Sequence, residues 1–223
     1  VHCDVKPENI LVGADVGAEP GTAGTLKLCD FGQAAAPEHV GSYVGTRWYR
    51  PPELLLGARG DQAVDIWAAG CTLAELVLRR PLFPGSDGRD MLFKICGELG
   101  APDPAEVQAW PLASKFIEAS RRTNASAAAW SSLASAGASE AGVKLLSDLL
   151  AYDPARRLRP DKVLKEAPFF AQWAPEAAMP LPPARPVSPG TLQRHREEAT
   201  AVEKRICKAQ PADAGAGAGA AAA

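Results

Sequence analysis

Features common in secreted and membrane proteins are missing from this sequence. Its five cysteines are an odd number at irregular spacing with no CxxC pair. That pattern argues against a disulfide framework or a zinc knuckle and favours reduced, intracellular thiols. No stretch reaches the roughly 18 apolar residues of a membrane span, because the nearest candidate, residues 66–78, is too short and contains Glu75. We therefore expect no membrane-spanning segment.

The chain also has a small net charge and few aromatic side chains. The formal net charge is −2, from 24 Lys and Arg against 26 Asp and Glu, which gives no electrostatic reason to expect nucleic acid or an anionic membrane as a partner. Aromatic residues make up 6% of the chain, and much of its 47% hydrophobic content is alanine, which predicts a thin core. With 223 residues, the chain has room for about one and a half domains. The first residue is Val1, directly before a dense motif, so we expect a piece of a longer polypeptide.

Two elements near the N-terminal end can be predicted from local patterns. Residues 10–12 and 25–29 are strand-like runs that flank a Gly/Ala-rich stretch, which predicts a hairpin with an enlarged turn over 13–24. From Asp61 the apolar residues recur at helical spacing on nearly all sides, which predicts a buried helix that the run 81–85 stops.

The remainder of the chain alternates helical patterns with looser segments. Amphipathic helices are predicted from Asp87 to Leu99, around 143–150 and over 160–166. Ser139, followed three residues later by Gly142, makes a poor capping box for the second of these helices. The Ser/Ala/Asn-rich stretch 120–138 is interpreted as a loose surface insert. After Trp173 the composition becomes Pro-rich, charged and finally Gly/Ala-rich, so residues 174–223 are predicted to be a disordered tail.

Three short segments carry chemistry. The first is HCDVKPEN, from His2 to Asn9; the second is DFG, from Asp30 to Gly32; the third is GTRWYRPPE, from Gly45 to Glu53. Phosphoryl transfer needs a carboxylate near the acceptor hydroxyl, oxygen ligands for Mg²⁺ and a cation near the transferred phosphate. Asp4, then Asn9 with Asp30, and Lys6 are residues of those types, and hard oxygen donors suit Mg²⁺ better than zinc.

These segments, in this order, resemble the catalytic loop, the DFG motif and the end of the activation segment of eukaryotic protein kinases. The resemblance continues through Asp65-x-Trp67-x-x-Gly70 and Asp153-Pro154-x-x-Arg157. It covers residues 1–173 and implies the C-terminal lobe of the fold. That lobe would be mainly α with small β hairpins around the active site, with the N-terminal β lobe absent.

The resemblance also implies roles for single residues. Asp4 would orient the substrate hydroxyl and accept its proton, Lys6 would approach the γ-phosphate of ATP, and Thr46 would hydrogen-bond to both. Asn9 and Asp30 would hold Mg²⁺. The residues implied to line the adenine site are Leu11 and Cys29.

Further positions are implied to be structural or regulatory. His2 and Phe31 would stack in a spine anchored by Asp65, next to Gly32 of the DFG motif. Glu53 would pair with a buried Arg157, the alternative being a weak surface pair. The positions implied to act in the activation segment are Tyr43, a candidate phosphorylation site together with Ser42, and Arg50, which would shape a pocket for proline after the acceptor residue.

The third segment indicates which subgroup of the protein kinases this sequence resembles. GTRWYRPPELLLG is similar to the cyclin-dependent, MAP and related kinases that phosphorylate Ser or Thr before proline, and LFPG at 82–85 favours the cyclin-dependent kinase-like members. The implied partners are protein substrates with Ser/Thr-Pro sites and a cyclin-like or other regulatory subunit, in the nucleus, the cytoplasm or both. Tyr43 is closer to the MAP-kinase or cyclin-dependent-kinase-like pattern.

Three departures from the family pattern leave a rival interpretation open. Cys3 stands where the family has an Arg that grips an activation-segment phosphate, and a thiol cannot make that contact. The hairpin turn is enlarged, and the Gly-rich loop and strand lysine of the N-terminal lobe are not in this sequence. The alternative is therefore a pseudokinase or scaffold that uses this lobe to dock partners, although the intact Asp4, Lys6, Asn9 and Asp30 argue against it.

Overall fold

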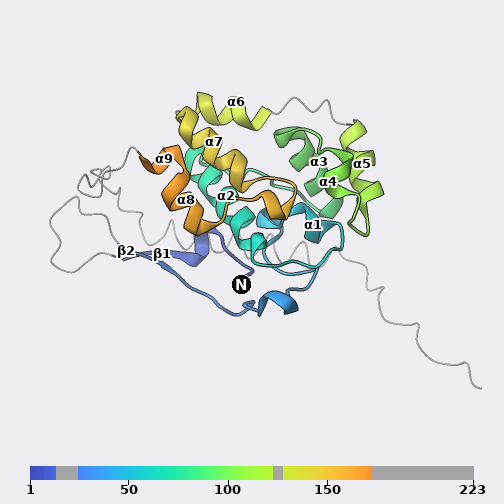
Figure 1. Cartoon of the computed structure of the whole chain (residues 1–223), viewed down its shortest axis with the longest axis horizontal. Helices are drawn as coiled ribbons and strands as arrows, with labels where there is room; N and C mark the ends of the chain where they lie inside the picture. The colour runs from blue at the N-terminus through green and yellow to red at the C-terminus, as the bar shows by residue number, and fades with distance from the viewer. Residues whose placement is uncertain (14–24, 123–127, 172–223) are drawn as a thin grey trace, which may run out of the picture. The chain divides into compact units, whose positions relative to one another are not determined.

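The computed structural model describes residues 1–13, 25–122 and 128–171, which are mostly helical with one two-stranded sheet (Figure 1). The strands are β1 (Ile10–Gly13) and β2 (Thr25–Leu28), and the helices are α1 (Pro52–Leu55), α2 (Ala63–Leu78), α3 (Gly88–Leu99), α4 (Pro104–Val107), α5 (Ala113–Arg122), α6 (Ala128–Ser135), α7 (Glu140–Leu149), α8 (Pro160–Glu166) and α9 (Pro168–Ala171). Short 3₁₀ turns cover Pro7–Asn9, Pro37–His39, Arg47–Tyr49 and Pro154–Arg156.

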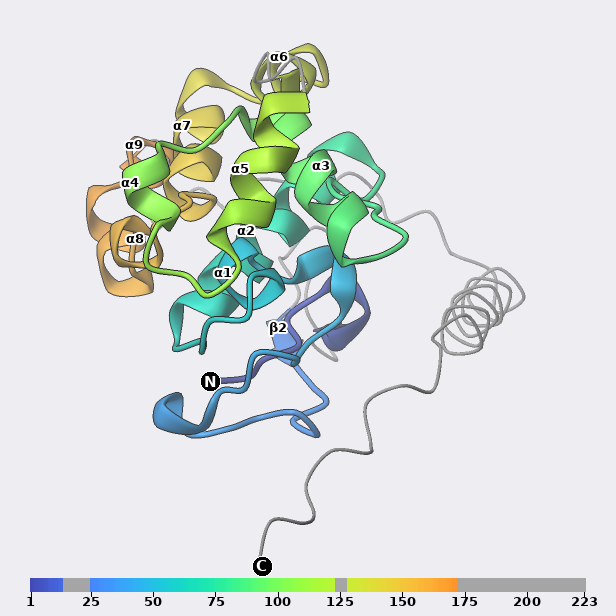
Figure 2. The same ribbon diagram turned by 90° about the vertical axis from the view of Figure 1, so that its right-hand side faces the viewer.

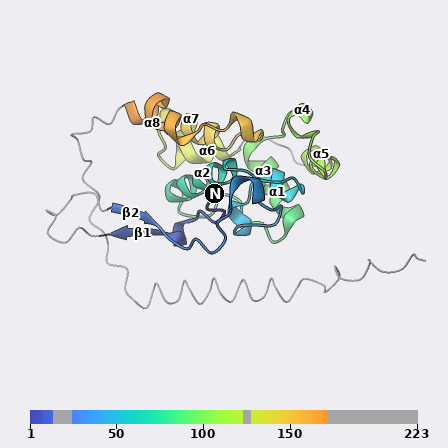
Figure 3. The ribbon, with the colours of Figure 1, turned by 60° about the horizontal axis from the view of Figure 1, so that its bottom comes forward.

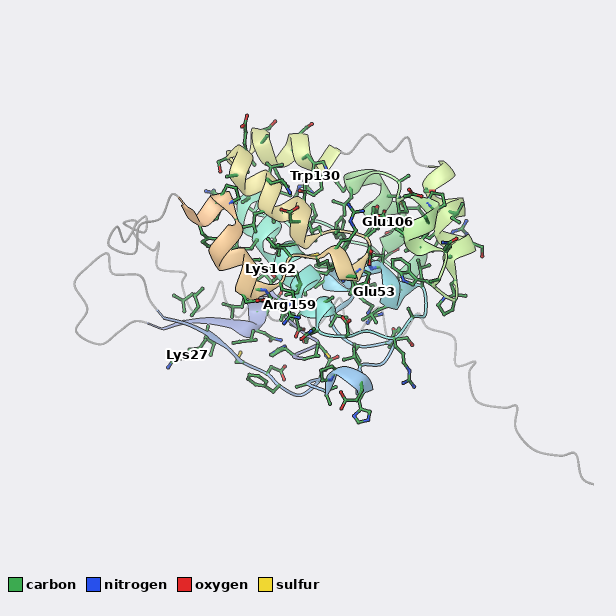
Figure 4. The ribbon with its side chains drawn as sticks, viewed as in Figure 1. Lys27, Glu53, Glu106, Trp130, Arg159 and Lys162 are labelled. Carbon is green, nitrogen blue, oxygen red and sulfur yellow. The ribbon has the colours of Figure 1, made fainter. Side chains whose placement is uncertain are left out.

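The predicted hairpin is confirmed. β1 and β2 pair antiparallel, with Ile10 opposite Leu28 and Gly13 opposite Thr25. The pair lies at the edge of the helical body, and the labelled Lys27 extends away from the helices (Figures 1, 3 and 4). The enlarged turn, 14–24, lies outside the described residues.

Helix α2 is the central element of the core. It packs against α6 and α7, and its Trp67, Cys71 and Ala74 side chains are at most 1% exposed. The predicted buried helix is confirmed for most of its length, but one face is not covered, because Leu73 is 39% and Leu76 is 66% exposed. These two leucines are three residues apart and share one face, so the apolar pattern around α2 overstated its burial.

Polar caps begin two of the predicted helices. The Asp87 carboxylate accepts from the backbone N–H groups of Arg89 and Asp90 at the start of α3. Ser139 was predicted to make a poor capping box, because Gly142 has no side chain to complete one, but its own hydroxyl oxygen still accepts from the Gly142 N–H at 3.1 Å at the start of α7. A serine cap of this kind contributes about 1 kcal/mol. The weak sequence signal came from the glycine at the third helical position, which a capping box does not expect.

The prediction of a loose insert over 120–138 was also wrong. Part of that stretch forms α6, whose Ala129 and Leu133 side chains are fully buried, and α3 packs against both α5 and α6. Alanine has the highest helix propensity, and the spacing of these two residues places both on one face. Figure 4 labels Trp130 of the same helix, which is partly buried against the core. Residues 123–127 lie outside the described residues.

The largest buried side chains gather around α2 and α3. Trp67 stacks on Phe83 with ring centroids 5.8 Å apart, and Met91, Ile95 and Phe116 are fully buried beside them. Among the described residues, no helix is both long and apolar enough to cross a membrane. The predicted tail, 174–223, lies outside the described residues.

Candidate active site

An aspartate of α2 holds the loop that contains Asp4. The Asp65 carboxylate accepts from the His2 N–H at 2.6 Å and from the Cys3 N–H at 2.8 Å. Cys3 adopts a left-handed backbone conformation, with φ of 66°, which is uncommon for a residue other than glycine. The two hydrogen bonds to Asp65 hold this turn in place and direct the next residue, Asp4, toward the activation segment.

The Asp4 carboxylate is buried and receives donors from three directions. Its Oδ1 accepts from the backbone N–H of Thr46 at 2.8 Å and from the Thr46 hydroxyl at 2.7 Å. Its Oδ2 accepts from Nδ2 of Asn9 at 3.2 Å and lies 3.0 Å from Nζ of Lys6. The four residues therefore form one hydrogen-bonded cluster, although 42 positions separate Asp4 from Thr46.

This cluster sets the ionisation of Asp4. Burial alone would raise the pKa of its carboxyl, but the hydrogen bonds from Thr46 and Lys6 and the charge of Lys6 outweigh burial and lower the pKa. Lys6 also donates from Nζ to the Thr46 hydroxyl at 2.7 Å, so that hydroxyl accepts from the lysine while it donates to Asp4. The aspartate is held as a carboxylate beside a cation.

Asn9 and Asp30 are the residues that would hold Mg²⁺. Asn9 donates from Nδ2 to the Asp4 carbonyl at 2.8 Å as well as to the Asp4 carboxylate, so its amide oxygen faces away from Asp4. Asp30 is exposed in a left-handed conformation, with φ of 62°, and its Oδ1 accepts from the Gly32 N–H. Both are hard oxygen donors of the kind that suits Mg²⁺. Within the described residues, no group of three or more His, Cys, Asp or Glu side chains could hold a metal.

The residues implied to line the adenine site lie on the hairpin. Leu11 of β1 is 54% exposed, and Cys29 follows β2 as a half-buried residue whose N–H donates to the Asn9 carbonyl at 2.9 Å. His2 donates from Nε2 to the Cys29 carbonyl at 3.0 Å and meets Phe31 edge-on, with ring centroids 4.9 Å apart. The structure thus brings the catalytic loop, the hairpin and the DFG motif together.

Glu53 and Arg157 form a buried, bidentate ion pair. Their side chains join Nη1 to Oε1 at 2.6 Å and Nη2 to Oε2 at 2.7 Å, and the arginine also donates to the carbonyls of Ala63, Ala151 and Tyr152. The surface-pair alternative is excluded, because Glu53 is 2% and Arg157 is 4% exposed (Figure 4 labels Glu53). The pair joins α1 to the turn after α7.

Arg50 organises the end of the activation segment. It donates from Nε to the Val44 carbonyl at 3.0 Å and from Nη2 to the Gly45 carbonyl at 2.7 Å, and its guanidinium lies 4.3 Å from the centre of the exposed Tyr43 ring. Gly45 has a φ of +77°, and a Cβ there would lie 2.5 Å from the Cys3 carbonyl oxygen. Glycine is therefore required at this position.

Comparison with known proteins decides the family. The family described as "Protein kinase domain" matches residues 1–170. The chain belongs to the protein kinase family.

Relatives place this chain in the cyclin-dependent kinase group. The chain is 35% identical to "Serine/threonine-protein kinase crk1" of Schizosaccharomyces pombe, covering 82% of this chain and 52% of that protein. It is 39% identical to "Cyclin-dependent kinase D-1" of Oryza sativa subsp. indica (83% and 42%) and 36% identical to "Cyclin-dependent kinase 20" of Pongo abelii (87% and 57%). The chain thus spans about half the length of these relatives.

Two contacts at the site were not predicted from the sequence. Gln33 accepts through Oε1 from the Gly45 N–H at 2.8 Å, and the Tyr49 hydroxyl donates to Glu75 at 2.7 Å. Burial raises the pKa of Glu75; the bond from Tyr49 partly offsets this effect, and the nearby charge of Glu8 adds to it. The available signal was that Glu75 interrupts the apolar run 73–78 of α2, which indicates a buried polar partner.

Proposed function

We propose that this chain acts as the C-terminal lobe of a longer Ser/Thr protein kinase, which transfers the γ-phosphate of ATP to protein serine or threonine. The observation that carries this proposal is the Asp4 cluster, in which Thr46, Lys6 and Asn9 all contact one buried carboxylate. The match to about half the length of the relatives supports the assignment to a longer protein.

The contacts suit the chemistry of phosphoryl transfer, which depends on positioning and electrostatics. A carboxylate with a lowered pKa stays ionised at neutral pH and can accept the proton of a substrate hydroxyl. Thr46 fixes the carboxylate from one side, and Lys6 places a positive charge beside it for an incoming phosphate. Mg²⁺, held by Asn9 and Asp30, would supply charge neutralisation of the phosphates.

The same geometry supports a preference for proline after the acceptor residue. Arg50 donates to the carbonyl oxygens of both Val44 and Gly45, so each has one lone pair engaged before a peptide binds and is a weaker acceptor for it. A substrate residue with a backbone N–H at this place would lose its hydrogen bond to water and find these carbonyls engaged. Proline has no N–H to satisfy.

The relatives named as cyclin-dependent kinases support a cyclin-like regulatory subunit as a partner of the longer protein. The proposal places that protein inside the cell, in the nucleus, the cytoplasm or both, where its cysteines stay reduced.

Peptide phosphorylation by the longer protein tests this function. Two peptides that differ only in Ser-Pro against Ser-Ala are compared at equal concentration, with an Arg50→Lys variant beside the wild type. We expect a strong preference for Ser-Pro that weakens in the variant, because lysine cannot engage both carbonyls. Equal rates on the two peptides would refute the proline preference, and no transfer to either peptide by a folded, ATP-bound protein would favour the scaffold alternative.

A further inference from the structure

The segment between the DFG motif and Thr46 is anchored at its middle by one buried side chain. Val40 follows the short turn Pro37–His39 and is 1% exposed, although its neighbours in the segment are exposed or half-buried. It packs in a small apolar cluster with Cys3, Leu54 and Val64, which we call the Val40 cluster. In Figure 2 this stretch of chain, drawn in blue, runs below the helices between β2 and α1.

The cluster joins three parts of the site. Cys3 precedes the catalytic Asp4, Leu54 belongs to α1, and Val64 lies in the first turn of α2 beside Asp65. Val40 therefore ties the activation segment to the same loop and helix that position the Asp4 carboxylate.

Glycine at position 60 makes room for this packing. A Cβ at Gly60 would lie 2.7 Å from Cγ1 of Val40, 2.7 Å from Cγ1 of Val64 and 3.1 Å from Cδ2 of Leu54. Packed side chains do not tolerate contacts this short, so any larger residue would push Val40 and Val64 apart or displace one of them. The Val40 cluster is therefore tightly packed where it meets Gly60.

The rest of the segment is held by groups already present in the chain. The Ala35 N–H donates to the Val1 carbonyl at 3.0 Å, and Gln33 accepts from the Gly45 N–H. The lining of the small cavity beside Cys3 includes one cation, Arg50, and its Nε and Nη2 are committed to two backbone carbonyls. Each of these anchors pairs backbone or side-chain groups with one another and uses no phosphate as a partner.

We propose that the Val40 cluster is an apolar latch that holds segment 33–46 in the position where Thr46 reaches Asp4, so that this site assembles without phosphorylation of the segment. The importance of this latch for catalysis rests on the proposed kinase function. The latch itself can be tested without any phosphoryl transfer.

Thiol labelling of the 223-residue chain provides the test, because Cys3 lies under the latch. Its side chain is 6% exposed, burial raises the pKa of its thiol, and the adjacent cavity of about 10 Å³ has room for no more than a water molecule. A maleimide can reach Cys3 only when the segment opens, so the labelling rate reports the open population. Cys71 and Cys96, which are 1% and 0% exposed in the helical core, report global unfolding in the same sample.

The experiment compares unmodified wild-type chain, verified by intact mass, with three variants. Val40→Ala and Gly60→Ala should each speed the labelling of Cys3 by about tenfold or more, while labelling of Cys71 and Cys96 stays slow. Gly97→Ala is the matched control, because a Cβ at Gly97 meets nothing within 4 Å. It should label like the wild type.

Two results would overturn the proposal. One is rapid labelling of Cys3 in the unmodified wild-type chain, whether or not the core cysteines also react. The other is slow labelling of Cys3 in both Val40→Ala and Gly60→Ala at the wild-type rate, which would show that Val40 does not hold the segment.

Discussion

Arg157 and its neighbour Arg156 differ in burial, and that difference decides what each ion pair contributes. Arg157 and Glu53 are both buried and share two hydrogen bonds. Arg156 also forms an ion pair, with Glu106 at 2.6 Å, but its side chain is 70% exposed. Solvent screens the Arg156–Glu106 pair. Loss of one partner from the Arg157–Glu53 pair instead leaves an unpaired charge in the core.

We therefore expect Arg157→Leu to lower the free energy of unfolding by about 3–5 kcal/mol. The adjacent substitution Arg156→Leu should cost less than about 1 kcal/mol. Urea unfolding of the two variants beside the wild type measures both values. Equal losses in the two variants would show that burial of the Glu53 pair adds nothing.

Glu75 gives a pH-dependent prediction. Because burial raises its pKa in the folded chain, folding disfavours the ionised form, and Glu75 lowers the stability as the pH rises above its ordinary pKa of 4.5. Below that pH the carboxyl is protonated in both states and the penalty disappears. Glu75→Gln keeps an acceptor for the Tyr49 hydroxyl and removes the charge.

The Glu75→Gln variant should be more stable than the wild type at pH 7, and the difference should shrink toward zero as the pH falls below about 4.5. Urea midpoints measured at pH 7 and pH 4 test this expectation. Glu140→Gln, an exposed position at the start of α7, serves as the control. A stability gap for Glu75→Gln that is independent of pH would contradict the account.

At the scale of elements, α6 is a helix that the composition of its stretch did not predict. The stretch was interpreted as a loose insert because serine, alanine and asparagine dominate it. Yet Leu133 is fully buried against the core, and α3 packs on the helix that carries it. Leu76 of α2 shows the converse, since it continues an apolar pattern and is 66% exposed.

Leu133→Ala should therefore lower the free energy of unfolding by about 2–5 kcal/mol, because it leaves a cavity in the core. The same change at the exposed Leu76 should stay within about 0.5 kcal/mol of the wild type. Chemical unfolding of both variants gives the comparison. A Leu133→Ala loss no larger than that of Leu76→Ala would mean that α6 does not contribute to the core.

The sequence predicts what depends on local pattern and misses what depends on distant packing. The hairpin, α3 and α8 follow from turn residues, caps and spacing, so their positions could be stated in advance. The contacts of Thr46 with Asp4 and Lys6 agree with what the resemblance to protein kinases implied, whereas the bond from Asn9 to the Asp4 carboxylate was not predicted. The burial of Val40 could not be predicted, because a single valine between turn residues becomes buried only when α1 and α2 meet it.

At the scale of the whole molecule, the proposed catalytic residues and the residues proposed to line the adenine site differ in how far they are buried. Asp4, Lys6, Asn9 and Thr46 contact one another within the described residues, whereas Leu11 on the hairpin is largely exposed. The chain also spans about half the length of its relatives. We expect the isolated 223-residue chain to bind ATP weakly and to show no transfer to a Ser-Pro peptide above an Asp4→Asn control.

The most direct test of the central claim is transfer of labelled γ-phosphate to a Ser-Pro peptide by the proposed longer protein. Asp4→Asn keeps the size of the side chain and removes the charge, and Asp161→Asn, at an exposed position on α8, is the matched control. The account predicts a loss of at least about 100-fold in kcat for Asp4→Asn with unchanged ATP binding, and wild-type rates for Asp161→Asn. Wild-type turnover by Asp4→Asn would contradict it.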